Sequence, residues 1–306
     1  MHSNPYIFCI KGNSHEDGPG IRSVLFFKGC PLNCIWCHNP ESKKSEPELW
    51  WEKTKCIGDG ACVKVCTQKA RSGCANDTVD LKHCTQCFKC AQVCPTTALS
   101  IIGKQSSVQE LVKDVSQYKT FFDVSGGGVT LSGGEPLLYV EYVGELLKKL
   151  KANNIHTLIE TAGLFQYEHV EKLVLENTDV IYFDIKLLDS TLHEKYCGVK
   201  NHRILENFKQ LVHYSLINNI NVLPRTPLIP GITDTESNIY KIIELYTELG
   251  IKEAALLPNN PMGLSKSESV CGYVNAIKDP RISTFYDNDK LQDIKDIFEA
   301  HHIKII

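Results

Sequence analysis

Three cysteines within eight residues constrain this chain more than any other feature of its sequence. They are Cys30, Cys34 and Cys37, in the stretch Cys-Pro-Leu-Asn-Cys-Ile-Trp-Cys-His-Asn-Pro. Thiolates are the ligands that select zinc, copper(I) or iron–sulfur clusters. A structural zinc site takes four ligands, and Cys9, the candidate before the loop, precedes a separate predicted strand. The spacing therefore predicts a [4Fe–4S] cluster whose fourth iron is left open, with a zinc knuckle or a metal-free turn as the alternatives.

The composition predicts a globular protein with a substantial core, since 42% of the 306 residues are hydrophobic and 23% are charged. A net charge of −3 lacks the excess of positive charge that is typical of proteins that bind nucleic acid or an anionic membrane. The sequence contains no apolar run of membrane-spanning length and no secretory signal pattern at its start. Eleven of the 14 cysteines lie between Cys30 and Cys94 at spacings typical of metal ligands. We therefore expect a cytoplasmic protein, in a compartment that keeps thiols reduced, and a monomer.

Hydrophobic patterns predict strands that alternate with helices along most of the chain. Strands are expected at 5–10, 21–28, 128–132, 156–161, 179–185, 220–226 and 252–257. Helices are expected at 108–115, after a cap at Ser106 or Ser107, and at 139–152, 167–176, 203–217, 235–249 and 288–301. Regular alternation favours a parallel sheet with right-handed crossovers. About six units are too few for the usual eightfold closure, so we expect an α/β fold built as a partial, open (β/α)6 barrel.

A cysteine-rich repeat with a period of 28 residues interrupts this alternation. Cys84, Cys87, Cys90 and Cys94, followed by proline, form the C-x2-C-x2-C-x3-C-P run of bacterial ferredoxins. The corresponding earlier positions are Cys56, Asp59, Cys62 and Cys66. We therefore expect three segments: 1–51 begins the barrel and carries the three-cysteine loop, 52–102 is a ferredoxin-like insertion, and 103–306 completes the barrel.

The fourth cysteine of each ferredoxin run binds the other cluster. This rule predicts one auxiliary cluster held by Cys84, Cys87, Cys90 and Cys66, and another held by Cys56, Asp59, Cys62 and Cys94. A carboxylate is a harder ligand than a thiolate but can bind iron, so Asp59 can complete the second cluster. That site can also hold a three-iron or unstable cluster, or Cys74 can replace Asp59. Such clusters are expected to pass single electrons to the three-cysteine site; a structural role is the alternative.

Polar motifs follow several predicted strands, at the edge where ligands bind in parallel sheets. Ser132-Gly-Gly-Glu-Pro136 follows one strand, and the bare carbonyls of Gly133 and Gly134 would suit an ammonium group. Glu135 disfavours a phosphate loop.

Asp184 and Lys186 lie two residues apart at the end of another predicted strand, so they share a face. They can hold a zwitterionic ligand or form a solvated ion pair. Arg225 lies near two prolines in an irregular strand and would suit an anionic or hydroxyl-rich ligand.

Together these motifs resemble the glycyl-radical-enzyme activating enzymes of the radical S-adenosylmethionine (SAM) superfamily, which include the pyruvate formate-lyase activating enzyme. The matching segments are Asp17-Gly-Pro-Gly-Ile-Arg22, the three-cysteine loop as far as Ser42, Ser125 to Leu138, Asp184-Ile-Lys186 and Gly198 to Arg203. The insertion after the loop is similar to that of activating enzymes with extra clusters.

The resemblance implies that the methionine moiety of SAM binds the open iron. Reductive cleavage then gives a 5′-deoxyadenosyl radical, which removes a hydrogen atom from one glycine of a partner enzyme. An external one-electron donor such as ferredoxin or flavodoxin is expected.

By the same resemblance, the SAM site is formed by Trp36, Cys37, His38, Gly133, Gly134, Glu135, Thr161, Asp184, Ile185, Lys186, His202 and Arg225. The surface for the partner's glycine loop is formed by Asp17, Gly18, Pro19, Gly20 and Arg22. Glu160, Thr161 and Asp184 fall where some relatives hold a monovalent cation, with Glu160 in place of an aspartate.

The chain departs from the family pattern near its end. Relatives commonly carry Leu-Pro-Tyr-His-x-x-Gly-x-x-Lys-Tyr, whereas this chain has Leu257-Pro-Asn-Asn-Pro-Met-Gly-Leu-Ser-Lys266-Ser, which leaves the partner enzyme open. Cys9, Cys197 and Cys271 stand alone and are expected to be core or surface thiols. Two other functions remain as alternatives: a radical SAM maturase or mutase acting on another peptide or small molecule, and a non-catalytic electron carrier.

Overall fold

The computed structural model describes residues 4–74, 79–272 and 279–306, and its main element is a nine-stranded sheet in the order β11-β10-β9-β8-β7-β6-β2-β1-β5. The strands are β1 (Tyr6–Ser14), β2 (Arg22–Phe27), β5 (Lys104–Gln105), β6 (Gly128–Gly133), β7 (His156–Thr161), β8 (Val180–Asp184), β9 (Asn221–Leu228), β10 (Glu253–Pro258) and β11 (Lys304–Ile305). Strands β2 and β6 to β11 are parallel, whereas β1 and β5 are antiparallel additions at one edge. The sheet runs from β11 to β5 without closing on itself. The predicted open α/β barrel is confirmed.

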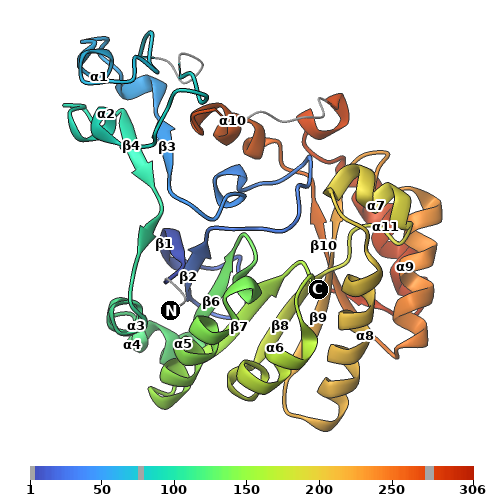
Figure 1. Ribbon diagram of the computed structural model, residues 1–306. Helices are drawn as coiled ribbons and strands as arrows, with labels where there is room; N and C mark the ends of the chain where they lie inside the picture. The colour runs from blue at the N-terminus through green and yellow to red at the C-terminus, as the bar shows by residue number, and fades with distance from the viewer. Residues whose placement is uncertain (1–3, 75–78, 273–278) are drawn as a thin grey trace.

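Helices cover the outer face of this sheet (Figure 1). They include α3 (Val108–Ser116), α4 (Lys119–Ser125), α5 (Val140–Ala152), α6 (Tyr167–Leu173), α8 (His202–Ile217), α9 (Glu236–Glu248) and α11 (Asn288–Ala300). The predicted cap of α3 is confirmed at Ser107, whose hydroxyl accepts from the backbone N–H of Glu110 at 3.2 Å. No helix within the described ranges is both long and apolar enough to cross a bilayer.

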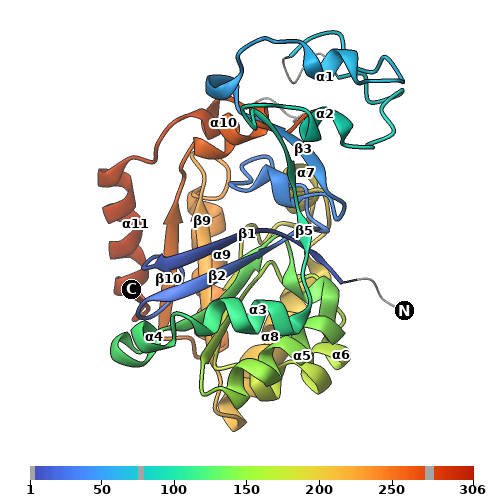
Figure 2. The same ribbon diagram turned by 90° about the vertical axis from the view of Figure 1, so that its left-hand side faces the viewer.

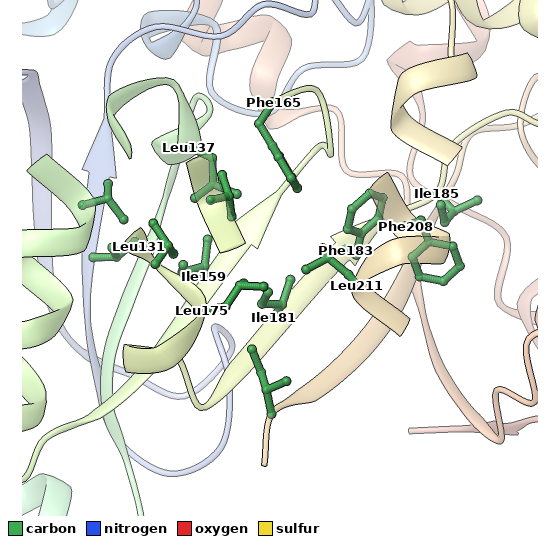
Figure 3. Close-up of a cluster of buried hydrophobic side chains, with 14 of the residues drawn as sticks. Leu131, Leu137, Ile159, Phe165, Leu175, Ile181, Phe183, Ile185, Phe208 and Leu211 are labelled. Carbon is green, nitrogen blue, oxygen red and sulfur yellow. The ribbon is translucent and has the colours of Figure 1, made fainter. Parts of the chain in front are cut away.

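Side chains alternate between the two faces of each strand, and this alternation separates the core from the functional face. Leu131, Ile159 and Phe183 point toward the helices and pack with Phe208 and other buried side chains of the main core (Figure 3). The intervening residues of the same strands therefore project from the opposite face of the sheet. Several of these residues are polar, and they form part of the site described below.

Two short helices that border the site were not predicted: α7 (Ser190–Cys197) and α10 (Met262–Ser269). Each has eight residues, which gives little more than two turns in which a hydrophobic period could show. Asp189 caps α7 by accepting from the N–H groups of Thr191 and Leu192.

The insertion stands beyond the end of the sheet at which β2 finishes (Figures 1 and 2). It is attached through an antiparallel pair, β3 (Glu48–Trp51) with β4 (Leu99–Ile102), and carries two single-turn helices, α1 (Ala61–Lys64) and α2 (Lys89–Gln92). At its base the fully buried Lys28 donates to the carboxylate of Glu48 at 3.0 Å and to the carbonyl of Glu41 at 2.5 Å. This buried ion pair joins the end of β2 to the start of the insertion.

Candidate functional site

The three-cysteine loop follows β2, at the edge of the sheet where all the parallel strands end. Backbone hydrogen bonds fix it to α7: Asn33 N–H donates to the carbonyl of Cys197 at 2.7 Å, and Ile35 N–H donates to that of Tyr196 at 3.1 Å. The two ends of the loop are joined by Gly29 N–H, which donates to the carbonyl of Ser42 at 2.7 Å. The loop is therefore held in one shape by the barrel itself.

Glycines allow neighbouring segments to approach this loop closely. A Cβ at Gly134 would lie 2.1 Å from the carbonyl oxygen of Gly29, and one at Gly263 would lie 2.4 Å from that of Cys37. Gly133 has a φ of +103°, and a Cβ there would lie 2.5 Å from the backbone N of Phe27. The Gly-Gly pair was predicted from ligand binding, and the structure adds a second reason for it, close packing against β2 and the loop.

The sulfurs of the loop lie in apolar surroundings. Cys34 is buried with Leu32 and Cys197, and Cys30 and Cys37 pack against the same cluster. Burial raises the pKa of Cys30 and raises that of Cys37 to about 11. Thiolates buried in this way require a positive partner, which a metal centre provides. The donor set and its environment therefore fit an iron–sulfur cluster.

Cys197 lies closer to this site than its isolated place in the sequence suggested. Its thiol donates a hydrogen bond to the sulfur of Cys34, which lowers the pKa of Cys34 to about 7, although burial opposes the shift. Cys197 itself is fully buried, as the prediction of a core or surface thiol allowed. The contact with Cys34 could not be read from the sequence, because it depends on the unpredicted helix α7.

Four charged side chains form an ion-pair network at the ends of β7, β8 and β9. Arg225 donates to Asp184 through Nε at 3.0 Å and Nη2 at 2.9 Å, and to Glu160 through Nη1 at 2.6 Å. Lys186 Nζ donates to the other oxygen of Asp184 at 3.2 Å, and Ser132 Oγ donates to Glu160 at 2.5 Å. The predicted Asp184–Lys186 pair is thus an ion pair, and its lysine is only 8% exposed rather than solvated.

The protonation states follow from this pairing. Burial alone would raise the pKa of Asp184, but Arg225 and Lys186 outweigh it and the pKa of the carboxyl is lowered. Burial would likewise lower the pKa of Lys186, whereas Asp184 raises it to well above its usual value. Asp184 and Lys186 therefore both stay charged at neutral pH, in an arrangement that can bind a zwitterion.

Glu135 and Thr161 are connected to each other. Glu135 is fully buried and accepts hydrogen bonds from Thr161 Oγ1 at 2.9 Å and from the N–H of Ala162 at 2.8 Å. Burial raises the pKa of Glu135 to about 7, despite these hydrogen bonds. These hydrogen bonds thus connect the end of β6 to the end of β7, next to the three-cysteine loop.

The remaining predicted SAM residues surround this edge of the sheet. Trp36, which lies within the loop, is half-buried. It packs against the apolar cluster that contains Ile35 and Tyr196, and against the cluster around Cys34. Ile185 is buried, and its N–H donates to the carbonyl of Arg225 at 2.8 Å. His38 and His202 are exposed, the latter in the first turn of α8.

The segment Asp17 to Arg22 lies at the opposite end of β2, since Arg22 pairs with Gly128 at the start of β6. The prediction that Arg22 belongs to a partner-binding surface is wrong for its side chain, which is fully buried. Its guanidinium donates to Thr130 Oγ1 at 2.7 Å and to the carbonyl of Val129 at 2.8 Å. These acceptors satisfy a buried arginine within the fold, so the side chain anchors the segment. Asp17 and Gly18 are half-buried, and Pro19 is exposed.

The C-terminal segment that departs from the family pattern also contacts the loop. Lys266 of α10 donates to Asn39 Oδ1 at 2.9 Å and pairs with Glu41 at 3.4 Å. Together with the close contact between Gly263 and Cys37, these interactions place α10 against the far end of the three-cysteine loop.

In the insertion, one hollow brings together a complete predicted ligand set. Its lining residues include all four members, Cys56, Asp59, Cys62 and Cys94, and additionally Cys74. The crossed assignment, in which Cys94 joins ligands of the other run, is therefore compatible with the geometry.

The second set is less clearly assembled. Cys84 lines a second hollow together with Cys271, whereas Cys87 is exposed. Cys271 reaches the insertion because its N–H donates to the carbonyl of Leu49 in β3 at 2.9 Å, a contact that the sequence did not indicate.

Within the described residues, no three His, Cys, Asp or Glu side chains converge as ligands of a single metal ion would. A [4Fe–4S] cluster takes its ligands at separate corners, so the sulfurs around it stand further apart than those around one ion.

Comparison with known proteins identifies close relatives of the whole chain. Residues 73–245 match the radical SAM superfamily, and residues 16–69 match a 4Fe-4S single cluster domain. The chain is 40% identical over 268 residues to the isethionate sulfite-lyase activating enzyme of Oleidesulfovibrio alaskensis, covering 85% of this chain and 84% of that one. It is 36% identical over 301 residues to the trans-4-hydroxy-L-proline dehydratase activating enzyme of Clostridioides difficile, covering 97% of both chains.

Among solved structures, SuiB of Streptococcus suis bound to its precursor peptide SuiA is similar in fold. The TM-score is 0.53 at 14% identity, over 90% of this chain and 46% of that one. At this identity the likeness concerns the fold alone.

Proposed function

The chain belongs to the radical SAM family of glycyl-radical-enzyme activating enzymes, and from that premise we propose how its own residues perform the activation. As a member of this family it cleaves SAM reductively and activates a glycyl radical enzyme. The observation that carries the proposal is the juxtaposition of the three-cysteine loop with the Arg225–Asp184–Lys186–Glu160 network at one edge of the sheet.

We propose that Cys30, Cys34 and Cys37 hold the [4Fe–4S] cluster. When bound, this cluster supplies one electron to the sulfonium of SAM, giving methionine and a 5′-deoxyadenosyl radical that takes a hydrogen atom from a glycine Cα of the partner. The loop's hydrogen bonds to α7 and its contacts with Gly134 and Gly263 hold the loop backbone, and therefore the three sulfurs, in fixed positions. The apolar surroundings of the sulfurs exclude water from the site.

The methionine moiety of SAM is proposed to bind at the charged network. Asp184 and Lys186 present opposite charges side by side, which suits an amino group and a carboxylate on neighbouring atoms. Gly133 and Gly134 contribute backbone, and Trp36, His38, Ile185 and His202 are proposed to border the rest of the nucleotide. Glu135 and Thr161 support the strands beneath it.

Arg225 occupies carboxylate oxygens that the predicted monovalent cation would need as ligands. The oxygens of Glu160 and Asp184 already accept hydrogen bonds from Arg225, Lys186 and Ser132, and Thr161 Oγ1 donates to Glu135. We propose that the guanidinium of Arg225 supplies the positive charge at this position.

The partner's glycine loop is proposed to enter along the face of the sheet that is turned away from the helices. This face begins at the Asp17 to Gly20 segment and leads past Tyr182, over whose ring Arg225 lies at 5.1 Å, to the charged network. Asp17, Gly18, Pro19 and Gly20 are the proposed contacts, with Arg22 as their buried anchor.

Residues 52–102 are proposed to be a ferredoxin-like domain with two auxiliary [4Fe–4S] clusters. The insertion stands beyond the end of the sheet at which β2 finishes (Figures 1 and 2), and the three-cysteine loop follows β2 at that end. This position supports a role in relaying electrons from an external donor such as ferredoxin or flavodoxin. We propose that the chain works as a cytoplasmic monomer.

Anaerobic reconstitution with iron and sulfide tests the proposal. With SAM and dithionite, the protein should form 5′-deoxyadenosine, and it should generate a glycyl radical signal by electron paramagnetic resonance (EPR) on one candidate partner. The relatives suggest a panel of isethionate sulfite-lyase, trans-4-hydroxy-L-proline dehydratase and choline trimethylamine-lyase. Formation of 5′-deoxyadenosine without a radical on any glycyl radical enzyme would contradict the proposed partner class, and its absence would contradict the radical chemistry.

A further inference from the structure

One auxiliary site contains more ligand-type side chains than a [4Fe–4S] cluster needs. The hollow lined by Cys56, Asp59, Cys62 and Cys94 is also lined by Cys74. Four sulfurs and one carboxylate therefore compete for four iron corners.

Cys74 is half-buried at this hollow. Its sulfur lies 3.8 Å from that of Cys62, which is only 5% exposed, so Cys74 is within reach of the site, and the two sulfurs would move apart to bind separate corners of a cluster. Cys74 also packs against the same small apolar cluster as Cys62 and Cys94, which includes Leu49 and Leu99. A short distance before it in the chain, Arg71 forms a β-bridge to Val79. The backbone leading into Cys74 is thus anchored next to the site.

Asp59 is exposed, and its Oδ1 accepts a hydrogen bond of 3.4 Å from the N–H of Ala61 at the start of α1. Binding the cluster would remove this exposed carboxylate from water, which costs free energy. Asp59 therefore already has a local role that needs no metal.

Ligand chemistry favours the same choice. Iron–sulfur clusters are held by thiolates, which are softer ligands than carboxylates. The sulfur of Cys74 can supply the ligand that the repeat lacks at position 59. Cys94, from the other cysteine run, would still bind this cluster, as the ferredoxin rule predicts. The chain would then compensate for the loss of one cysteine in the run with another from outside it.

We propose that Cys74, and not Asp59, is the fourth ligand of the auxiliary [4Fe–4S] cluster whose other ligands are Cys56, Cys62 and Cys94. The inference rests on the proposed function of the insertion as a two-cluster domain. It assigns this cluster four thiolates, as in a ferredoxin with a complete run, and leaves Asp59 as a solvent-facing residue at the start of α1.

The test compares full-length proteins purified and reconstituted without oxygen. Iron and sulfide are counted, and EPR of the oxidised proteins measures [3Fe–4S]⁺, which forms when one corner of a cubane has no protein ligand. The open corner of the three-cysteine cluster contributes to this signal in every variant, so wild type sets the baseline. Cys74→Ala should lose iron and raise the signal above that baseline, while Asp59→Ala should keep the wild-type iron content and the baseline signal. Cys9→Ala, at an exposed cysteine of β1, is the matched control and should also stay at the baseline.

A rescue variant separates loss of a ligand from loss of the fold. Cys74→Ala combined with Asp59→Cys restores the ferredoxin spacing, so it should recover the iron content and return the [3Fe–4S]⁺ signal to the wild-type level. A signal above the wild-type level in Asp59→Ala, or wild-type iron in Cys74→Ala, would overturn the assignment. Failure of the rescue would also count against it, because the restored run should hold the cluster. A wild-type protein with no iron beyond the three-cysteine site would instead refute the proposed two-cluster domain.

Discussion

Replacing Arg225 with methionine removes a side chain that joins Glu160 to Asp184. Arg225 makes three charged hydrogen bonds to these carboxylates, at 2.6, 2.9 and 3.0 Å, and the three side chains are 11%, 14% and 21% exposed. Breaking a buried ion pair from one side costs about 3–5 kcal/mol. Because this network retains some exposure, we expect the lower end, about 3 kcal/mol. In a chain of this length that corresponds to a fall in melting temperature of about 5 °C.

The structure also predicts which second substitution repairs the variant. Asp184 keeps Lys186 as a basic partner at 3.2 Å, whereas the hydrogen bonds of Glu160 in the described residues come from Arg225 and Ser132. Arg225→Met with Glu160→Gln should therefore recover most of the lost melting temperature. Arg225→Met with Asp184→Asn should recover less, because it removes the partner of Lys186.

The pH dependence provides an independent check. Arg225 and Lys186 lower the pKa of Asp184 against the effect of burial. This stabilisation is fully present above the usual aspartate value of about 3.9 and is lost as the pH falls through the lowered folded-state pKa. The difference between wild type and Arg225→Met should thus be largest at neutral pH and shrink in acid. Anaerobic calorimetry measures it, and an unchanged melting temperature, or a difference that grows in acid, would refute the reasoning.

Three further substitutions test other contacts of the site. Gly263→Ala places a Cβ 2.4 Å from the carbonyl oxygen of Cys37, so it should lower the iron content of the three-cysteine site; full occupancy would contradict that contact. Cys197→Ala removes the thiol that donates to Cys34. Because hydrogen bonds to cluster sulfurs favour the reduced state, potentiometric EPR should find a more negative potential, which Cys197→Ser restores. Burial raises the pKa of Glu135 to about 7, so the native state holds this proton more tightly than the unfolded chain, and stability falls as the pH rises from about 5 to 8. Glu135→Gln should flatten the plot of melting temperature against pH over this interval, and an unchanged slope would exclude the carboxyl as its cause.

The features predictable from the sequence were those with a local signal. Cysteine spacing indicated the three-cysteine loop, and the alternation of apolar strands with amphipathic helices indicated the open parallel sheet. The parallel arrangement then brought Asp184, Lys186 and Glu135 to one edge, because strands of one direction end together. The cap at Ser107 was recognisable because it lies directly before the first apolar helical position.

The features that the sequence did not reveal depend on partners far apart in the chain. The burial of Arg22 is made possible by acceptors on β6, more than 100 residues away. The contact of Cys197 with Cys34, and that of Cys271 with the insertion, depend on segments whose place in space follows from packing rather than from a local pattern. Arg225 was predicted to face an anionic or hydroxyl-rich ligand, whereas it already pairs with two carboxylates of the neighbouring strands.

The central claim is that three sulfurs hold a cluster with one iron open to SAM. The most direct measurement is the EPR spectrum of the anaerobically reduced protein with and without SAM, recorded for wild type and for Cys37→Ala. We predict that SAM changes the wild-type spectrum, and that the change is absent from the variant. Identical wild-type spectra with and without SAM, or zinc in place of iron at this loop, would contradict the claim.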